Sequence, residues 1–514
     1  MADREQTEAG TVKHRGMITG AVMLATVMQV LDTTITNVVL PNMQGSLGAS
    51  LDTITWVLTS YIVAAAIMTP VTGWLADQFG RKRLFLASVS GFTAASVLCG
   101  LAGSLEQMVI FRILQGMFGA ALVPLSQSVL LDINPRERHG QAMALWGAGI
   151  MVGPIVGPSL GGWLTDSLDW RWVFYINIPV GILAFFGILV FMPAVGKRVR
   201  RFDFFGFAML ALAVGSFQMI LDRGQQLDWF AAKEIWIETG LALSTFWIFV
   251  THTLTARDGF IDPKIFQNRN FLTGLAFILI VGIILLASMA LLPPMLQKLM
   301  GYSTVSTGLV LAPRGIGTMI SMLLVGRLIR KIDTRLLIFA GLLLISWSLW
   351  DMAGFTLDMG QKTIITTGII QGLGLGLVFI PLSTISFATL DARFRTDATS
   401  LFSLVRNLGS SVGVSVVFTM LARNTQIHRG VLIENITPFN PSLHLPSAEL
   451  LGSGTEQSLL LLNHEISRQA MMSAYLNDFK VMMFVTLAAV PMLLFLRHPR
   501  RQTQPSGKST APTG

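Results

Sequence analysis

The stretch TITWVLTSYIVAAAIMTPVTGWLADQFGRKRLFLASVSGFTAASVLCGLAG, residues 53–103, places two long apolar runs on either side of a short charged loop. A run of about 20 mainly apolar residues is what an α-helix needs to cross a bilayer. Similar runs recur from Ile18 to Leu496. The sequence therefore predicts an all-α integral membrane protein that crosses the bilayer many times.

The composition of the 514-residue chain agrees with this, because 52% of it is hydrophobic and only 13% is charged. A soluble domain carries about 25% charged residues, so a soluble domain with a single anchor is excluded. The net charge of +9 lies mainly in short loops between apolar runs. That placement sets membrane topology and is not typical of a nucleic-acid-binding face.

The sequence gives no sign of enzyme chemistry or of a metal site. The single cysteine, Cys99, lies in an apolar run and cannot form an intramolecular disulfide or a four-ligand metal site. Zinc-protease, nucleophile-elbow and P-loop patterns do not occur. No cofactor and no metal are expected, and an integral-membrane enzyme is the weaker alternative to a transporter.

Apolar runs between charged or Gly/Pro-rich breaks predict fourteen transmembrane helices. The predicted spans are 17–40, 53–72, 84–103, 107–131, 140–164, 172–193, 204–222, 235–255, 271–294, 303–326, 335–354, 363–389, 399–421 and 479–496.

The charged loops orient these spans. If the N-terminus is cytoplasmic, the cytoplasmic loops hold most of the 37 lysine and arginine residues. Basic residues are enriched in cytoplasmic loops, so both termini are predicted to be cytoplasmic.

An internal echo indicates two related halves. Gln115 and Gln371 are 256 positions apart, and so are Gly153 and Gly409. Transporters are often built from parallel repeats, and this offset pairs the fourth span with the twelfth. The expected architecture is two six-helix bundles in parallel repeat with two inserted helices. The expected parts are a cytoplasmic N-terminus at 1–16, a first bundle at 17–196, the inserted helices at 197–256, a second bundle at 257–496 that includes a long periplasmic loop at 422–478, and a disordered cytoplasmic tail at 497–514.

Five motifs carry a resemblance to a known family. They are LDTTITNVVLP at 31–41, GWLADQFGRKR at 73–83, RILQG at 112–116, GIMVGPIVGPSLGG at 149–162 and WRWVFYINIP at 170–179. Together they resemble the major facilitator superfamily, and the first and last are similar to signatures of its fourteen-helix drug/proton antiporter branch. The resemblance spans nearly the whole chain.

The resemblance implies a proton-coupled antiporter of the bacterial inner membrane that exports amphipathic hydrophobic drugs or toxic compounds by alternating access. A narrow-specificity metabolite exporter of the same fold stays open as an alternative. The implied partners are small-molecule substrates, protons and the lipid bilayer, with no nucleic acid.

Two charged residues inside predicted spans are the expected proton-coupling groups, Asp32 and Arg112. An ionisable side chain inside a membrane is costly and usually functional, and an arginine beside a carboxylate favours release of its proton. The alternatives are an aspartate bonded to helix-end groups and an arginine bonded to helix carbonyls.

The resemblance also implies a cytoplasmic gate and a bent helix. The gate residues are Gly73, Asp77, Gly80 and Arg81, and ordinary topology-setting charge is the alternative for this loop. Small residues at four-residue intervals allow close helix packing, and proline bends a helix. The expected antiporter helix bend is formed by Gly153, Pro154, Gly157 and Pro158.

The substrate cavity is expected to involve the polar residues Thr36, Gln115, Arg314 and Arg406. The long loop at 422–478 contains a possible amphipathic helix at 458–475, with a solvated connector as the alternative. Relatives of this type work with a periplasmic membrane-fusion adaptor and an outer-membrane channel, and this loop is the expected contact.

Overall fold

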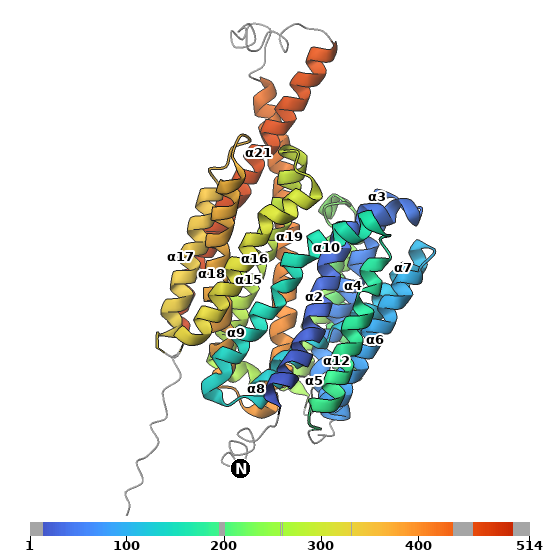
Figure 1. Cartoon of the computed structure of the whole chain (residues 1–514), viewed down its shortest axis with the longest axis vertical. Coiled ribbons are helices and arrows are strands. Elements are labelled where there is room, and N and C mark those ends of the chain that lie inside the picture. Colours follow the sequence, from blue (N-terminus) through green and yellow to red (C-terminus); the bar gives the residue numbers. More distant parts are fainter. Residues whose placement is uncertain are drawn as a thin grey trace, which may run out of the picture.

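The computed structural model describes residues 14–194, 201–256, 259, 261–329, 331–434 and 456–496, and all regular secondary structure within them is helical (Figure 1). Most of the predicted N-terminal segment, most of the basic run after the sixth span, the middle of the long loop and the C-terminal tail lie outside the described residues.

The first half contains the predicted spans one to six. Its helices are α2 (Arg15–Ser46), α3 (Leu51–Ile54), α4 (Trp56–Met68), η1 (Thr69–Val71), α5 (Thr72–Phe79), α6 (Arg81–Leu101), α7 (Leu105–Gly119), α8 (Leu122–Ile133), η2 (Arg136–Arg138), α9 (His139–Ile150), α10 (Val152–Ser167), α11 (Trp172–Tyr175) and α12 (Asn177–Phe191).

The inserted pair and the second half follow. The pair is α13 (Phe204–Arg223) and α14 (Lys233–Thr255), joined through η3 (Trp229–Ala231). The second half contains η4 (Pro263–Gln267), α15 (Arg269–Pro294), η5 (Met295–Leu299), α16 (Thr304–Leu328), α17 (Thr334–Met352), α18 (Gln361–Ala388), η6 (Ala392–Phe394), α19 (Arg395–Glu434), α21 (Glu456–Ala488) and η8 (Val490–Phe495).

Thirteen helical segments of the described chain are long and apolar enough to cross a membrane. The predicted span outside these thirteen is the eighth, 235–255, which corresponds to α14. This helix is 23 residues long but carries charge near its start, including Glu234 and Glu238. The predicted helical membrane fold is therefore confirmed. Polar caps begin several helices, as where the Ser104 hydroxyl accepts a hydrogen bond from the Gln107 amide at the start of α7.

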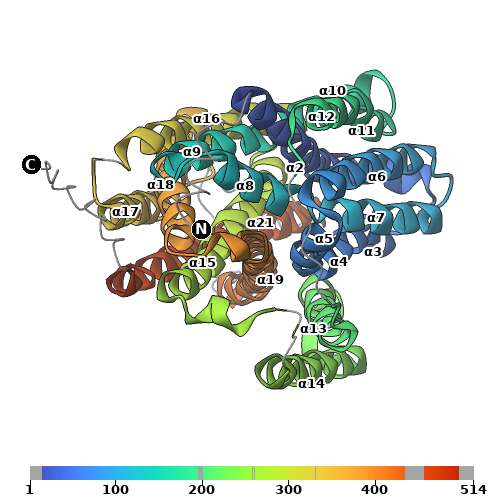
Figure 2. The same cartoon turned by 90° about the horizontal axis from the view of Figure 1, so that it is seen from below.

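The two halves lie side by side, with α13 and α14 at one edge (Figures 1 and 2). We call the end of the bundle where α2 begins the proximal face, and the end where α2 finishes the distal face. The helix α14 packs on α13, and α13 contacts both α4 and α19. Gln218 of α13 donates to Ser411 of α19 at 2.8 Å, so the inserted pair touches both halves.

Glycines place corresponding helices of the two halves in close contact. Gly153 and Gly157 of α10 pack on Val30 and Thr34 of α2, where a Cβ would lie 2.7 and 2.8 Å from side-chain carbons. In the second half, Gly409 and Gly413 of α19 pack on the backbone of α15. The glycines that are 256 positions apart in sequence therefore make corresponding helix contacts.

Two expectations about loops were wrong. Residues 73–79, expected in a loop, form the helix α5 and extend the second span to Phe79. In the segment 422–478, expected as a loop, the described residues are helical, because α19 continues to Glu434 and α21 begins at Glu456. The expected amphipathic helix at 458–475 is thus the first part of α21, which extends beyond the distal face in Figure 1.

Candidate proton-coupling site and proximal latch

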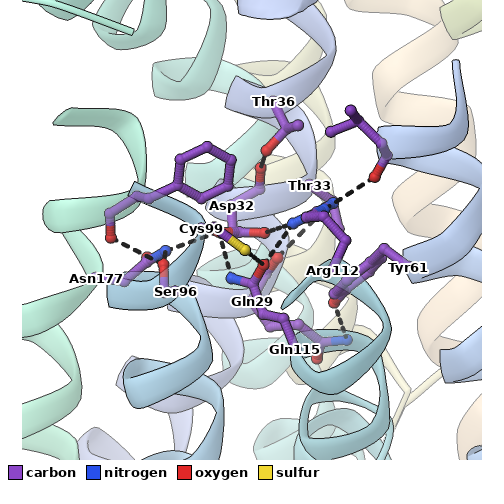
Figure 3. A network of polar contacts seen from close by, with 12 residues as sticks. Gln29, Asp32, Thr33, Thr36, Tyr61, Ser96, Cys99, Arg112, Gln115 and Asn177 are labelled. Carbon is purple, nitrogen blue, oxygen red and sulfur yellow. Dashed lines mark hydrogen bonds and ion pairs between the residues drawn. The ribbon is translucent and has the colours of Figure 1, made fainter. Parts of the chain in front are cut away.

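Asp32 lies in the middle of α2 with only 1% of its surface exposed, and three side chains from two other helices bind its carboxylate. Arg112 Nη1 of α7 lies 2.8 Å from Oδ2, and Gln115 Nε2, one turn further along α7, donates to Oδ1 at 2.8 Å. Asn177 Nδ2, at the start of α12, donates to Oδ1 at 2.8 Å (Figure 3). The carboxylate is therefore fully enclosed by donors.

Arg112 is held as tightly as its partner. Its Nε donates to the Val57 carbonyl of α4 at 3.0 Å, and its Nη1 donates to Gln115 Oε1 at 2.6 Å. The guanidinium carbon lies 4.3 Å from the ring centroid of Tyr61. Such contacts stabilise a cation away from water, and they fix the guanidinium in the orientation that meets Asp32.

A further ring of contacts orients these side chains. Asn177 Nδ2 also donates to Ser96 Oγ of α6 at 2.9 Å, and Ser96 donates to the Phe174 carbonyl at 2.9 Å. Thr36 Oγ1 donates to the Asp32 carbonyl at 2.7 Å, one turn along α2. Side chains from five helices, α2, α4, α6, α7 and α12, therefore contribute to one polar network inside the first half.

This network can respond to a proton. A buried ion pair is stable only while both charges are present, because removing one partner leaves an uncompensated charge. Protonation of Asp32 would leave Arg112 as an isolated buried cation and would favour another arrangement of the helices. Within the described residues, no group of three His, Cys, Asp or Glu side chains is placed to hold a metal ion.

The structure brings Asp32, Arg112, Gln115 and Thr36 together in one network. From the sequence, Asp32 and Arg112 were expected to couple protons, whereas Thr36 and Gln115 were expected in a substrate cavity. Thr36 and Gln115 are 1% and 0% exposed and are occupied by the Asp32 network. Asn177 and Ser96 were not predicted as site residues. The signal for Asn177 was present, since it is a polar residue within the quoted 170–179 motif.

A second cluster, the proximal latch, joins the two halves at the proximal face. Asp132, at the end of α8, forms ion pairs with Arg81 of α6 and with Arg395 of α19, the latter at 2.7 Å. Close by, Ser128 Oγ and Thr396 Oγ1 lie 3.1 Å apart. The predicted gate residue Arg81 therefore belongs to a contact between halves, through Asp132, which was not predicted.

The other predicted gate residues surround this latch. Gly73 packs against the Asp397 side chain of α19 so closely that a Cβ would collide with it. Gly80 has φ +88°, which favours glycine, and it begins α6. Asp77 interacts electrostatically with Arg81. The four predicted residues thus lie around one junction of the two halves.

The predicted helix bend lies beside the Asp32 helix. A single residue, Met151, separates α9 from α10. Pro154 lies in the first turn of α10, and Pro158 lies inside this helix. The glycines of α10 pack on α2 within two residues of Asp32. Movement of α10 would therefore act directly on the helix that carries the carboxylate.

Arg314 and Arg406 lie in the second half and have no carboxylate within ion-pair distance in the described chain. Arg314 is 6% exposed, and its Nη2 donates to Ser288 Oγ at 2.8 Å and to the Leu285 carbonyl at 3.4 Å. Arg406 of α19 is half-buried, and its Nη2 lies 3.5 Å from Asn407 Oδ1. The structure does not bring either arginine into the Asp32 network.

Comparison with known proteins places this architecture in a family. The model described as Major Facilitator Superfamily matches residues 22–414. The chain is 36% identical over 488 residues to the multidrug export protein EmrB of Escherichia coli K12, covering 94% of this chain and 95% of that protein. It is also 36% identical over 487 residues to the fatty acid resistance protein FarB of Neisseria gonorrhoeae, covering 94% and 96%.

Solved structures share the fold at much lower identity. The human organic anion transporter MFSD10 (TETRAN) matches with a TM-score of 0.63 at 13% identity, over 93% of this chain and 99% of that one. A double tryptophan mutant of XylE matches with the same TM-score and identity, over 95% and 96%. At 13% identity these likenesses indicate the fold alone.

Proposed function

The chain belongs to the major facilitator superfamily, and on that premise we propose that it exports amphipathic hydrophobic compounds in exchange for protons. It is a multi-pass inner-membrane transporter rather than an enzyme. Relatives that match almost the full chain are named for multidrug export and for fatty acid resistance. The first name refers to export of drugs, and the second refers to resistance to fatty acids, which are amphipathic.

The observation that carries the proposal is the buried Asp32–Arg112 ion pair at 2.8 Å. In the deprotonated state Arg112 neutralises the carboxylate. When a proton binds, Arg112 loses its counterion and the network that joins five helices changes its balance of charge. We assign proton exchange to Asp32, with Arg112 as the group that couples protonation to helix movement.

The proximal latch supports an assignment of the conformation. Asp132, Ser128 and Gly73 of the first half meet Arg395, Thr396 and Asp397 of the second half. The distribution of basic residues supports a cytoplasmic proximal face. With that orientation, both termini are cytoplasmic and this conformation is closed toward the cytoplasm. Opening the latch would give the opposite state of an alternating-access cycle.

The substrate path between the halves is proposed to use Arg314 and Arg406. Both are intramembrane charges that the proton-coupling network does not use. Thr36 and Gln115 would take part through the Asp32 network, because neither is exposed in this conformation.

The distal extension of α19 and α21 is the proposed contact for a periplasmic membrane-fusion adaptor and, through it, an outer-membrane channel. The extension carries exposed apolar side chains on both helices, including Ile427, Val431 and Leu460, which are 61%, 52% and 63% exposed. Apolar residues that project beyond a bundle are suited to a protein contact. The extension lies at the distal end of the molecule, whereas the latch lies at the proximal face (Figure 1).

Dye efflux from proteoliposomes under an imposed pH gradient tests the exchange. We expect gradient-driven efflux by the wild-type protein and none by Asp32→Asn, because an amide cannot carry the proton. Asp358→Asn is the matched control, since Asp358 is exposed between α17 and α18. Normal gradient-driven efflux by a folded Asp32→Asn variant would remove Asp32 from proton coupling.

A further inference from the structure

Among the described residues, the second half contains a buried cation, Arg314, without a counterion. Arg314 lies near the middle of α16, about 15 Å from one end of the helix and 21 Å from the other. Its hydrogen-bond partners in the described chain, Ser288 and the Leu285 carbonyl, are both neutral. A buried charge is stable in a membrane when it is paired, so the surroundings of Arg314 are electrostatically incomplete.

The carboxylates of this half do not complete them. Asp478 of α21 is 1% exposed, but neither of its oxygens has a hydrogen-bond partner, so it is not paired with Arg314. Arg406 adds a second positive charge, because the hydrogen bond of its guanidinium in the described chain is to a neutral amide. The described interior of the second half is therefore positive, whereas the Asp32–Arg112 pair leaves the first half neutral.

The repeat shows which positions of the two halves differ in charge. Gly116 of α7 packs on the carbonyl of Tyr61, and its counterpart Gly372 of α18 packs on the carbonyl of Arg314. Arg314 therefore occupies the position that Tyr61 has in the first half. The counterpart of Arg112 is Gly368, and a Cβ added to Gly368 would lie 3.4 Å from the Cβ of Arg314. The second half thus has its cation on the opposite helix of the pair.

A polar group without a partner lies on the same helix pair. Gln371 of α18, between Gly368 and Gly372, is 1% exposed, and neither its Nε2 nor its Oε1 has a hydrogen-bond partner. Its counterpart, Gln115, donates to a carboxylate. An unpartnered amide in this position has an unused donor and an unused acceptor for a ligand.

We propose that Arg314, together with Gln371, binds the anionic head group of an amphipathic substrate within the second half. A carboxylate or phenolate oxygen would accept hydrogen bonds from the guanidinium and supply the missing charge. Pro313, inside α16 and next to Arg314, removes one backbone hydrogen bond from the continuous helix and permits α16 to bend as the site opens. This inference rests on the proposed export function and specifies the charge of its substrate.

Binding of three probes with one ring system tests the site. They are naphthalene-2-carboxylate, the neutral 2-naphthamide and 2-naphthylmethyl-trimethylammonium, titrated calorimetrically into the full chain in phosphatidylcholine nanodiscs. We expect the wild type to bind the carboxylate roughly ten- to a hundred-fold more tightly than the amide, the range for a hydrogen bond to a charged group. Equal affinities for the three probes would overturn the proposal.

Variants test whether Arg314 causes the preference for the carboxylate over the amide. Arg314→Gln is expected to lose the carboxylate preference while its affinity for 2-naphthamide stays within about two-fold, and Arg314→Lys is expected to keep part of the preference. Arg327→Gln is the matched control, because Arg327 is an exposed arginine of the same helix. Loss of the preference in Arg406→Gln but not in Arg314→Gln would overturn the assignment to Arg314. If Arg314→Gln does not fold, the wild-type comparison and Arg314→Lys decide the question.

Two further measurements distinguish a substrate site from a lipid site, and this inference from the proposed function. Added phosphatidylglycerol should leave the preference unchanged, and competition by this lipid would overturn the substrate assignment in favour of a lipid head group. Dye efflux under a pH gradient is measured in parallel. Gradient-driven efflux without an anion preference would support the proposed function and overturn this site. An anion preference without gradient-driven efflux would support this site and overturn the proposed function.

Discussion

At the scale of single residues, Asp32 and Arg112 show how a charged pair is maintained inside an apolar bundle. Each ionised group is satisfied by neutral polar atoms as well as by its partner: the carboxylate by Gln115 and Asn177, and the guanidinium by the Val57 carbonyl. Such a pair is costly to break from either side. A proton is the smallest ligand that can break it reversibly.

The individual contributions to this network should differ in size. Arg112→Ala leaves Asp32 as a buried charge without a cation, so we expect gradient-driven transport to be lost. Asn177→Ala removes one hydrogen bond to a charged group, which is worth about 1.5–3 kcal/mol, so transport should fall roughly ten- to a hundred-fold. Ser96→Ala removes contacts to Asn177 and to the Phe174 carbonyl but none to a charged group, so it should have the smallest effect of the three.

Initial rates in proteoliposomes, normalised to the amount of folded protein, check this order. A larger loss for Ser96→Ala than for Asn177→Ala would contradict the assignment of Ser96 to positioning.

The sequence reveals a charge inside an apolar span, and for this reason Asp32 and Arg112 could be predicted. It does not reveal which neutral residues face that charge. Asn177 follows Asp32 by 145 positions, and only the packing of α12 beside α2 and α6 brings the two side chains within 2.8 Å. Asp132 was missed for a similar reason, because its partners Arg81 and Arg395 come from different halves.

At the scale of helices, the glycines of α10 should be required wherever they face α2. Gly157→Ala places a methyl group 2.8 Å from Thr34 Cγ2, which is closer than carbon atoms pack, so the folded state should be destabilised by about 1–3 kcal/mol. Gly162→Ala is the matched control on the same helix, because its nearest neighbour would be Val305 Cγ2 at 4.0 Å.

Thermal unfolding of the detergent-solubilised protein measures the difference between the two variants. The packing argument fails if Gly162→Ala lowers the melting temperature as much as Gly157→Ala does.

The proximal latch gives a prediction about α8 and α19. A cysteine pair made by Ser128→Cys and Thr396→Cys, in a Cys99→Ser background, should form a disulfide readily because the two hydroxyl oxygens lie 3.1 Å apart. Adding Asp132→Asn removes both ion pairs of the latch and should slow disulfide formation. Asp358→Asn should leave its rate unchanged.

Gel mobility after mild oxidation provides the readout. Unchanged cross-linking with Asp132→Asn would mean that the ion pairs do not hold the two halves together.

Hydropathy predicted where helices cross the bilayer but not how far they continue. Residues 422–434 and 456–478 are too polar to register as membrane spans, yet they extend α19 and α21 as helices. Helix continuation depends on packing between α19 and α21, as in the 2.8 Å contact of Asn477 with His428. A window of hydropathy contains no such information.

At the scale of the whole molecule, two related bundles perform different tasks. The first bundle holds a neutralised ion pair, whereas the described part of the second holds two arginines without a counterion, on α16 and α19, which are not the counterparts of α2 and α7. We infer that the first half handles the proton and the second handles the substrate. Such a division gives each ligand its own site and lets the movement of the halves couple them.

Charge movement follows from this division. Export of one monovalent anion in exchange for one proton carries two positive charges inward, and each charge contributes about 2.3 kcal/mol per 100 mV of membrane potential. A potential imposed by potassium and valinomycin should therefore accelerate export of naphthalene-2-carboxylate even without a pH gradient. Insensitivity of that export to the potential would exclude this exchange ratio.

The distal extension should matter only when a partner is present. A double variant that carries Ile427→Asp and Leu460→Asp is expected to leave dye efflux in proteoliposomes unchanged. Both residues are exposed, and neither belongs to the latch or to the Asp32 network. In cells, the same double variant should lose resistance to exported compounds if an adaptor binds there. Loss of efflux in proteoliposomes would instead assign the extension to transport itself.

The exchange of substrate for protons is tested most directly by counting protons when substrate binds. The purified protein in weakly buffered solution with a pH-sensitive dye, titrated with a transported compound between about pH 5 and pH 8, should release up to one proton per bound molecule. Asp32→Asn should bind the compound and release none. Equal proton release by the wild type and Asp32→Asn, or no release by the wild type at any pH, would contradict proton exchange at Asp32.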